Sequence, residues 1–342
     1  MVQAILKELD LQKDYLSDKS IETIYFGGGT PSLLDEKDLL LFFEKIYQLF
    51  SVTSNAEITL EANPDDLSLE KLKVLKNTPI NRLSIGVQSF NEADLQFMNR
   101  AHNANEATSC IQNAQSIGFD NLTVDLIYGS PTTSNSQWEK NVQQLFDFDI
   151  PHLSCYCLTV EPNTALDNFV KKGKAPAVDE EKSAHQFEML MQMMEANSYD
   201  HYEISNFAKP DMYARHNSNY WFGIPYLGVG PSAHSFNGKS RQWNIANNAF
   251  YIKDLKENKL NCEVETLSPD QQYNEYVMTS LRTMWGCDLE KIKSWGETTT
   301  QYFLNKSEVF IKNKTLQKEG QFFKLTRQGK LLADNISMEL FR

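Results

Sequence analysis

Short β-rich runs alternate with segments of helical periodicity along residues 1–206 of the chain. In one helical segment, apolar residues recur at helical spacing behind a predicted N-cap at Asp35. This alternation predicts βα units and a parallel sheet with helices on its outside. The strand candidates span residues 21–26, 57–62, 82–88, 121–128, 153–160 and 201–206.

Three of these candidates carry aliphatic residues on one face and polar residues on the other. In residues 57–62, isoleucine and leucine alternate with glutamate and threonine, and side chains alternate between faces along a strand. Parallel strands covered on both sides are usually apolar throughout, so a polar face favours a sheet that curls around a cavity. Glu61, Gln88 and Asp125 stand toward the C-terminal ends of their strands, where α/β proteins place ligands. We expect these three side chains to converge.

The alternation ends after residue 206. Residues 214–236 are rich in glycine, asparagine and aromatic residues and are expected to form a loop with short strands. The tail begins with a helix capped by Ser268 and ends with a strand, turn and helix typical of a winged-helix-like module. We therefore expect a partial α/β barrel at 1–206, a His- and aromatic-rich segment at 207–240, and a C-terminal helical, winged-helix-like domain at 241–342.

Composition narrows the class of protein. The chain of 342 residues is 41% hydrophobic and 23% charged, as in ordinary globular proteins, and is long enough for a barrel plus a small domain. No run approaches the roughly 18 apolar residues of a membrane span, and the amphipathic start is not a signal peptide, so a cytoplasmic protein is expected. A net charge of −12 disfavours a nucleic-acid partner, which needs clustered lysine and arginine.

The cysteines form an odd, scattered set that is not typical of a disulfide framework. Each is expected to be a reduced, buried structural thiol. They are Cys110, Cys155, Cys157, Cys262 and Cys287.

Candidate chemistry begins with the run of glycines at 27–29, followed by Thr30 and Pro31. Glycines let the backbone turn sharply and present N–H groups to a carboxylate or phosphate, although a purely structural tight turn explains them equally well. Glu61 and Gln88 suit the hydroxyls of a ribose, or they simply satisfy the barrel interior. Arg100 can bind an amino acid's carboxylate through two hydrogen bonds, or it can be a solvated residue at a helix end.

Six motifs follow one another along the chain. They are GGGTP at 27–31, EANPDD at 61–66, GVQSFN at 86–91 with NR at 99–100, VDLIYG at 124–129, YEISNFA at 202–208 and RHNSNYW at 215–221. In this order they resemble the oxygen-independent coproporphyrinogen oxidase-like family of radical S-adenosylmethionine proteins, and in particular its heme-chaperone branch. The resemblance covers nearly the whole chain.

The resemblance implies a fold and a cofactor. The fold is a partial (β/α)6 TIM-like barrel, here without its first strand, followed by the C-terminal module. Its cavity would bind S-adenosylmethionine, with the glycine-rich loop on the methionine part and the other positions on the ribose and the amino-acid part. The residues implied are Gly28, Gly29, Thr30, Glu61, Gln88, Arg100 and Asp125.

The family also binds a [4Fe–4S] cluster through a CxxxCxxC loop after the first barrel strand. That loop would precede Met1, and none of the cysteines present has its spacing. We expect a chain that starts at an internal methionine, with a natural cluster-free paralogue as the alternative. In either case this polypeptide is not expected to bind the cluster in the usual way, which leaves open whether it is an enzyme.

The motif RHNSNYW resembles the signature of the heme-chaperone branch and implies a heme site at His216, with Tyr220 and Trp221 beside the porphyrin. Without the resemblance, His216 would be interpreted as a structural, hydrogen-bonding histidine. His234 could complete the pocket or pack within the fold.

The leading interpretation is a heme-binding chaperone that delivers heme to an acceptor protein. The alternative is the oxygen-independent coproporphyrinogen III dehydrogenase, which converts propionates to vinyl groups by a radical mechanism. A tRNA-modifying member would need a basic surface, which the charge of −12 argues against. A nonenzymatic scaffold whose C-terminal module docks a partner stays open.

Overall fold

The computed structural model describes all 342 residues and divides into two compact units. Unit 1 holds residues 1–24, 35–56 and 215–342, and unit 2 holds residues 25–34 and 57–214. The expected three-segment division at residues 206 and 240 stays a prediction.

The main sheet has seven strands in the order β1-β2-β3-β4-β5-β7-β6. Its pairs from β2 to β5 are parallel. The expected α/β fold, a curled sheet with helices outside it, is confirmed. The strands are β1 (Ser20–Phe26), β2 (Ser51–Ala62), β3 (Arg82–Gln88), β4 (Leu122–Tyr128), β5 (His152–Cys157), β6 (Asp200–Glu203) and β7 (Asn206–Ala208).

The sixth strand candidate, 201–206, is not one parallel strand. It is a tight hairpin in which β7 pairs antiparallel with both β5 and β6. The chain reverses at Ile204 and Ser205. The Ser205 amide donates a hydrogen bond to the Glu203 carboxylate at 3.1 Å, which closes the turn. β5 also stops at Cys157, so residues 158–160 lie outside the strand.

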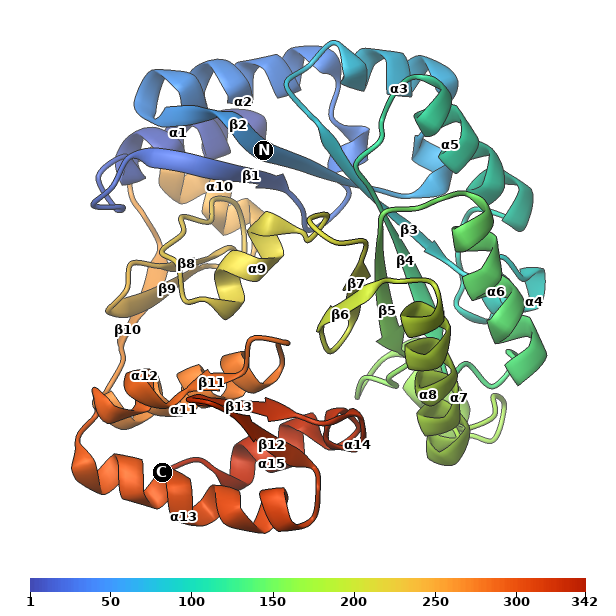
Figure 1. The fold of residues 1–342 in the computed structure, drawn as a ribbon. Coiled ribbons are helices and arrows are strands. Elements are labelled where there is room, and N and C mark those ends of the chain that lie inside the picture. The colour runs from blue at the N-terminus through green and yellow to red at the C-terminus, as the bar shows by residue number, and fades with distance from the viewer. The chain divides into compact units, whose positions relative to one another are not determined.

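Helices cover the outer face of the sheet in unit 2 (Figure 1). The aliphatic residues of β3 are fully buried, as alternation predicted. Trp138 is fully buried, lies 5.7 Å from the Tyr128 ring and donates its indole N–H to the carbonyl of Gln186 at 3.0 Å, which joins α6 to α8. The helices are α3 (Leu69–Lys76), α4 (Glu92–Phe97), α5 (Ala104–Ser116), α6 (Asn135–Asp147), α7 (Ala165–Lys171) and α8 (Glu180–Ala196), with 3₁₀ turns at Pro31–Leu33 and Pro64–Asp66.

Unit 1 contains the first two helices and a small antiparallel sheet of order β10-β9-β8. The Asp35 cap of α2 is confirmed, because its carboxylate accepts the Asp38 amide at 2.8 Å. Residues 214–236 were expected to form a loop with short strands, but Arg215–Trp221 forms helix α9. The other elements are α1 (Val2–Gln12), α2 (Glu36–Leu49), β8 (His234–Phe236), β9 (Ser240–Asn244), α10 (Asn248–Lys256) and β10 (Cys262–Thr266).

The C-terminal part of unit 1 runs helix, strand, two helices, two strands and two further helices, and its strands form a sheet of order β11-β13-β12. The first six of these elements follow the order of a winged-helix module. The predicted Ser268 cap is confirmed and forms a full capping box with Gln271. The elements are α11 (Pro269–Leu281), β11 (Cys287–Asp288), α12 (Leu289–Lys293), α13 (Glu297–Lys312), β12 (Leu316–Glu319), β13 (Phe322–Leu325), α14 (Arg327–Lys330) and α15 (Ala333–Glu339). None of the helices in the chain combines the length and apolarity needed to cross a membrane.

Candidate functional site

A polar cavity of about 200 Å³ lies in unit 2 at the C-terminal ends of β2, β3 and β4. The polar strand faces therefore do converge, as their alternation predicted. Six of the seven predicted cofactor residues line the cavity, and the seventh, Gly28, hydrogen-bonds one of them. The lining residues are Gly29, Thr30, Pro31, Ser32, Glu61, Ala62, Asn63, Ser84, Gly86, Gln88, Arg100 and Asp125.

The glycine run forms the loop after β1. Gly28 and Gly29 have φ angles of +72° and +63°, in the left-handed region that glycine adopts without strain. A side chain on Gly27 would collide with the ring of Tyr25. These positions therefore need glycine for the turn itself, whether or not the loop also faces a ligand.

Glu61 anchors this loop from the end of β2. The Tyr25 hydroxyl donates to its Oε1 at 2.6 Å, and the Gly28 amide donates to its Oε2 at 3.1 Å. Burial and the nearby Glu61 charge raise the pKa of Tyr25, so the phenol stays a donor. A carboxylate has about four acceptor positions, so Glu61 retains capacity toward the cavity. Tyr25 was missed in the sequence, although the face alternation used for the next strands would have found it on β1.

Arg100 is held in the cavity, not solvated at a helix end. Helix α4 ends where Asn99 takes a left-handed φ of +52°. The guanidinium then donates from Nη2 to Oδ1 of Asn63 at 2.7 Å and to the carbonyl of Gly86 at 3.2 Å. These bonds fix the plane of the guanidinium at the cavity wall.

Gln88 ends β3 with a φ of +68°, where the pairing with β4 changes register. Such a conformation costs about 1–3 kcal/mol in a residue with a side chain and concentrates at functional sites. Gly86 makes room for it, because a Cβ there would lie 2.9 Å from Nε2 of Gln88 and 3.5 Å from Nη2 of Arg100.

Asp125, on β4, is half-buried at the cavity floor. Burial raises its pKa to about 7, with a smaller upward contribution from the Glu61 charge, while a hydrogen bond from Ser154 acts in the opposite direction. Its carboxyl group therefore changes charge near neutral pH.

The second predicted centre, His216, lies in unit 1 on α9. Its Nδ1 lies 2.8 Å from Oγ1 of Thr23, and its Nε2 lies 2.9 Å from the hydroxyl of Tyr220, one helical turn further along α9. Burial lowers the pKa of His216 to about 4, so the imidazole is neutral near pH 7. The sequence did not reveal Thr23, which precedes His216 by 193 residues.

Large apolar side chains stand exposed around the end of α9. Tyr220, Phe222 and Ile224 are 41%, 53% and 46% exposed. Trp221 instead lies under Arg282, whose guanidinium carbon is 5.6 Å from the ring centroid. Residues five apart on a helix point in different directions, so Trp221 and His216 do not share a face.

The residues present do not fit a [4Fe–4S] cluster. All five cysteines are free, and no group of three or more His, Cys, Asp or Glu residues converges on a metal position. The expectation that every cysteine is buried is wrong for Cys157, which is exposed, and for Cys262, which is half-buried. Cys157 is the last residue of β5, whose final two residues are both exposed.

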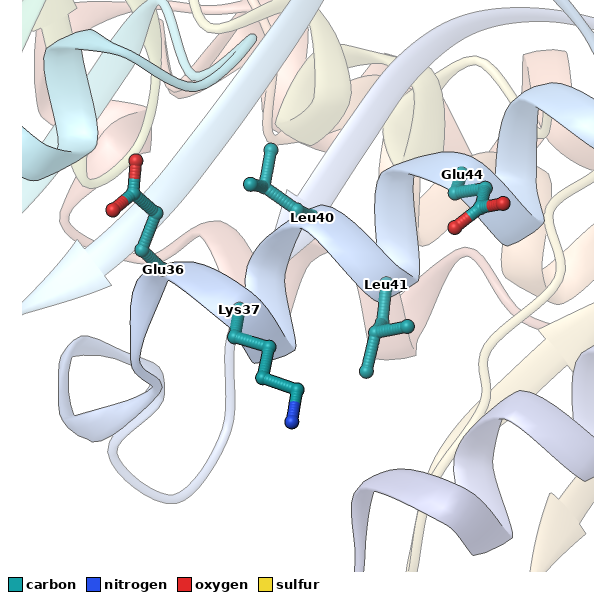
Figure 2. Close-up of a pocket in the computed structure, with 5 residues that line it drawn as sticks. All are labelled: Glu36, Lys37, Leu40, Leu41 and Glu44. Carbon is teal, nitrogen blue, oxygen red and sulfur yellow. The ribbon is translucent and has the colours of Figure 1, made fainter.

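A further surface hollow of about 290 Å³ lies along α2. Figure 2 shows that its side chains all project from this one helix. It is the space between side chains on an exposed helix and not an enclosed site. Its residues are Glu36, Lys37, Leu40, Leu41 and Glu44.

Two family models match the chain. The Radical SAM superfamily matches residues 3–145, and the HemN C-terminal domain matches residues 267–332. The chain is 33% identical to "Heme chaperone HemW" of Bacillus subtilis over 319 residues, which cover 92% of this chain and 84% of that protein. It is 31% identical to "Heme chaperone HemW" of Lactococcus lactis over 345 residues, 98% of this chain and 88% of that protein.

Among solved structures, the chain is similar to the coproporphyrinogen III oxidase HemN of Escherichia coli. The TM-score is 0.84 at 22% identity, over 99% of this chain and 82% of that one. At this identity the likeness shows the fold, a radical S-adenosylmethionine partial barrel with a small C-terminal module. The expected fold class is thereby confirmed.

Proposed function

Because the chain belongs to the HemW heme-chaperone family of radical S-adenosylmethionine proteins, we propose that it binds heme at His216 and passes it to an acceptor protein. The observation that carries the site is a neutral imidazole beside the exposed ring of Tyr220. Neutral imidazole is the form that ligates heme iron.

Tyr220 is the apolar side chain that lies directly beside His216. Its ring is 5.1 Å from the His216 ring and 41% exposed, and Phe222 and Ile224, close to it in sequence, are exposed as well. Tyr220 would contact a porphyrin whose iron atom His216 ligates.

We also propose that the unit 2 cavity binds S-adenosylmethionine. The Arg100 guanidinium would hold the carboxylate, and the loop at Gly28, Gly29 and Thr30 would contact the methionine part. The ribose hydroxyls would form hydrogen bonds with the side chains of Glu61, Gln88 and Asp125. In family members that bind the cluster, the cofactor is a source of radicals. The cysteines present do not fit a cluster, so the proposal covers binding of S-adenosylmethionine and does not extend to its cleavage.

The coproporphyrinogen III dehydrogenase alternative fits less well. Its support is the similarity to the HemN structure, which at 22% identity shows the fold alone. The Bacillus subtilis and Lactococcus lactis relatives, both above 30% identity, are named heme chaperones. The cytoplasmic location stays a prediction, in keeping with the five free cysteines.

The test is hemin binding followed by the Soret band. His216→Ala should weaken binding by at least about tenfold, because second-sphere or ligand losses at metal sites cost 10–100-fold. His185→Ala, at an exposed histidine of α8, is the matched control and should bind hemin as the unchanged protein does. Equal hemin affinity in the two variants would refute the assignment of His216.

A further inference from the structure

Both ring nitrogens of His216 contact hydroxyl groups, and the two hydroxyls come from different parts of unit 1. Oγ1 of Thr23, on β1, lies 2.8 Å from Nδ1. The hydroxyl of Tyr220, on the same helix as His216, lies 2.9 Å from Nε2. The rings of His216 and Tyr220 meet edge to face at 5.1 Å. The imidazole is thus bracketed between a strand and its own helix.

We infer that Thr23 is the positioning residue that directs Nε2 of His216 toward iron, and that the Tyr220 hydroxyl is an internal lock that must leave Nε2 before heme binds. The inference rests on the proposed heme site. It assigns to Tyr220 a role beyond contact with the porphyrin, and it adds a residue of β1 to the site.

The protons can be counted. A neutral imidazole has one N–H and one lone pair, so one hydroxyl accepts and the other donates. The Tyr220 phenol is far more acidic than the Thr23 alcohol and is therefore the better donor. The favoured arrangement has the Tyr220 O–H donating to Nε2 and the Nδ1–H donating to Thr23. This tautomer leaves the lone pair on Nε2, which is the atom a metal would use.

The two hydroxyls also differ in mobility. Thr23 is half-buried on a strand of the main sheet, and its β-branched side chain is stiff at χ1. The Tyr220 side chain is 41% exposed to solvent, and the Tyr226 ring meets its ring edge-on at 4.7 Å. Release of Tyr220 therefore opens Nε2, while Thr23 keeps the ring in place. Metal-bound histidines are commonly oriented by such a partner on the second nitrogen.

The lock predicts that Tyr220→Phe binds hemin more tightly, by about fivefold, and faster, because one hydrogen bond no longer competes while the ring is kept. Thr23→Val should weaken hemin binding by about tenfold and raise the reduction potential of the bound heme, since the Nδ1–H loses its acceptor and the imidazole becomes less electron-rich. Thr23→Ser, which keeps the hydroxyl, should restore both values.

A heme-free measurement separates this inference from the proposed function. Nitrogen-15 NMR of the imidazole in the unliganded protein, assigned by difference with His216→Gln, should show the Nδ1–H tautomer, with Nε2 unprotonated. The Nε2–H tautomer, or a Thr23→Val protein whose bound heme keeps the original potential, would overturn the inference. Failure of the His216→Ala test alone would instead refute heme ligation and leave the tautomer result standing.

Discussion

Replacing Glu8 with glutamine tests how one buried carboxylate holds unit 1 together. Glu8, on α1, is fully buried. Its Oε1 accepts from the side-chain amides of Gln12 at 2.7 Å and Asn244 at 2.6 Å. Its Oε2 accepts from the backbone amide of Gly230 at 2.8 Å and from the hydroxyl of Tyr251. Each oxygen therefore serves two donors, most of them more than 200 residues away in the chain.

Glutamine has the same shape but carries one oxygen and one NH2 group. If the NH2 group of the glutamine in Glu8→Gln faces Gly230 and Tyr251, the Tyr251 hydroxyl can rotate to accept from it, but the Gly230 amide loses its acceptor. At least one hydrogen bond to a charged group is therefore lost, worth about 1.5–3 kcal/mol. The free energy of unfolding should fall by at least about 2 kcal/mol, a large part of the roughly 5–15 kcal/mol of a typical domain.

Equilibrium urea denaturation followed by tryptophan fluorescence measures this loss. Glu257→Gln, on the exposed end of α10, makes the same chemical change at the surface and should stay within about 0.5 kcal/mol of the unchanged protein. Circular dichroism without urea checks that both variants are folded. A loss below about 1 kcal/mol for Glu8→Gln would refute the four-donor arrangement.

Two further predictions concern pH. With an Asp125 pKa of about 7, a rise from pH 6 to pH 8 adds a negative charge to the cavity. Because S-adenosylmethionine carries a cationic sulfonium, its affinity measured by calorimetry should rise over this range; a pH dependence that survives in Asp125→Asn would assign the effect to another group. With a His216 pKa of about 4, the imidazole gains a proton only near that pH, so hemin binding by Soret absorption should persist as the pH falls from 7 and fail near 4. A midpoint near 6.5 would contradict the burial of His216.

The cavity was predictable because it depends on two local rules. Alternation along a strand placed Glu61, Gln88 and Asp125 on one face, and parallel pairing brought the strand ends together. Arg100 was predicted by residue type and resemblance. Its actual support, the carbonyl of Gly86 and the side chain of Asn63, depends on a left-handed residue after α4 that no periodicity reveals.

The missed elements lack a local signal. Helix α9 contains two asparagines and a serine, which are weak helix formers, so its sequence resembles a loop. The hairpin of β6 and β7 turns at Ile204 and Ser205, without the glycine or asparagine that usually marks a tight turn. Thr23 reaches His216 from 193 residues away, a tertiary contact that no spacing rule encodes.

The hydrogen bonds from Tyr25 and Gly28 to Glu61 have a consequence for how this protein can change. The Glu61 carboxylate holds the glycine loop in place by accepting hydrogen bonds from Tyr25 and Gly28 before any ligand is bound. The loop therefore loses little conformational freedom when a ligand binds, which lowers the entropic cost of binding. The same arrangement makes three positions, one on β1, one in the loop after it and one on β2, depend on one another. A drifting or redesigned sequence could alter the ligand that this cavity selects by changing Gln88 or Asp125, but it would have to replace Tyr25, Gly28 and Glu61 together.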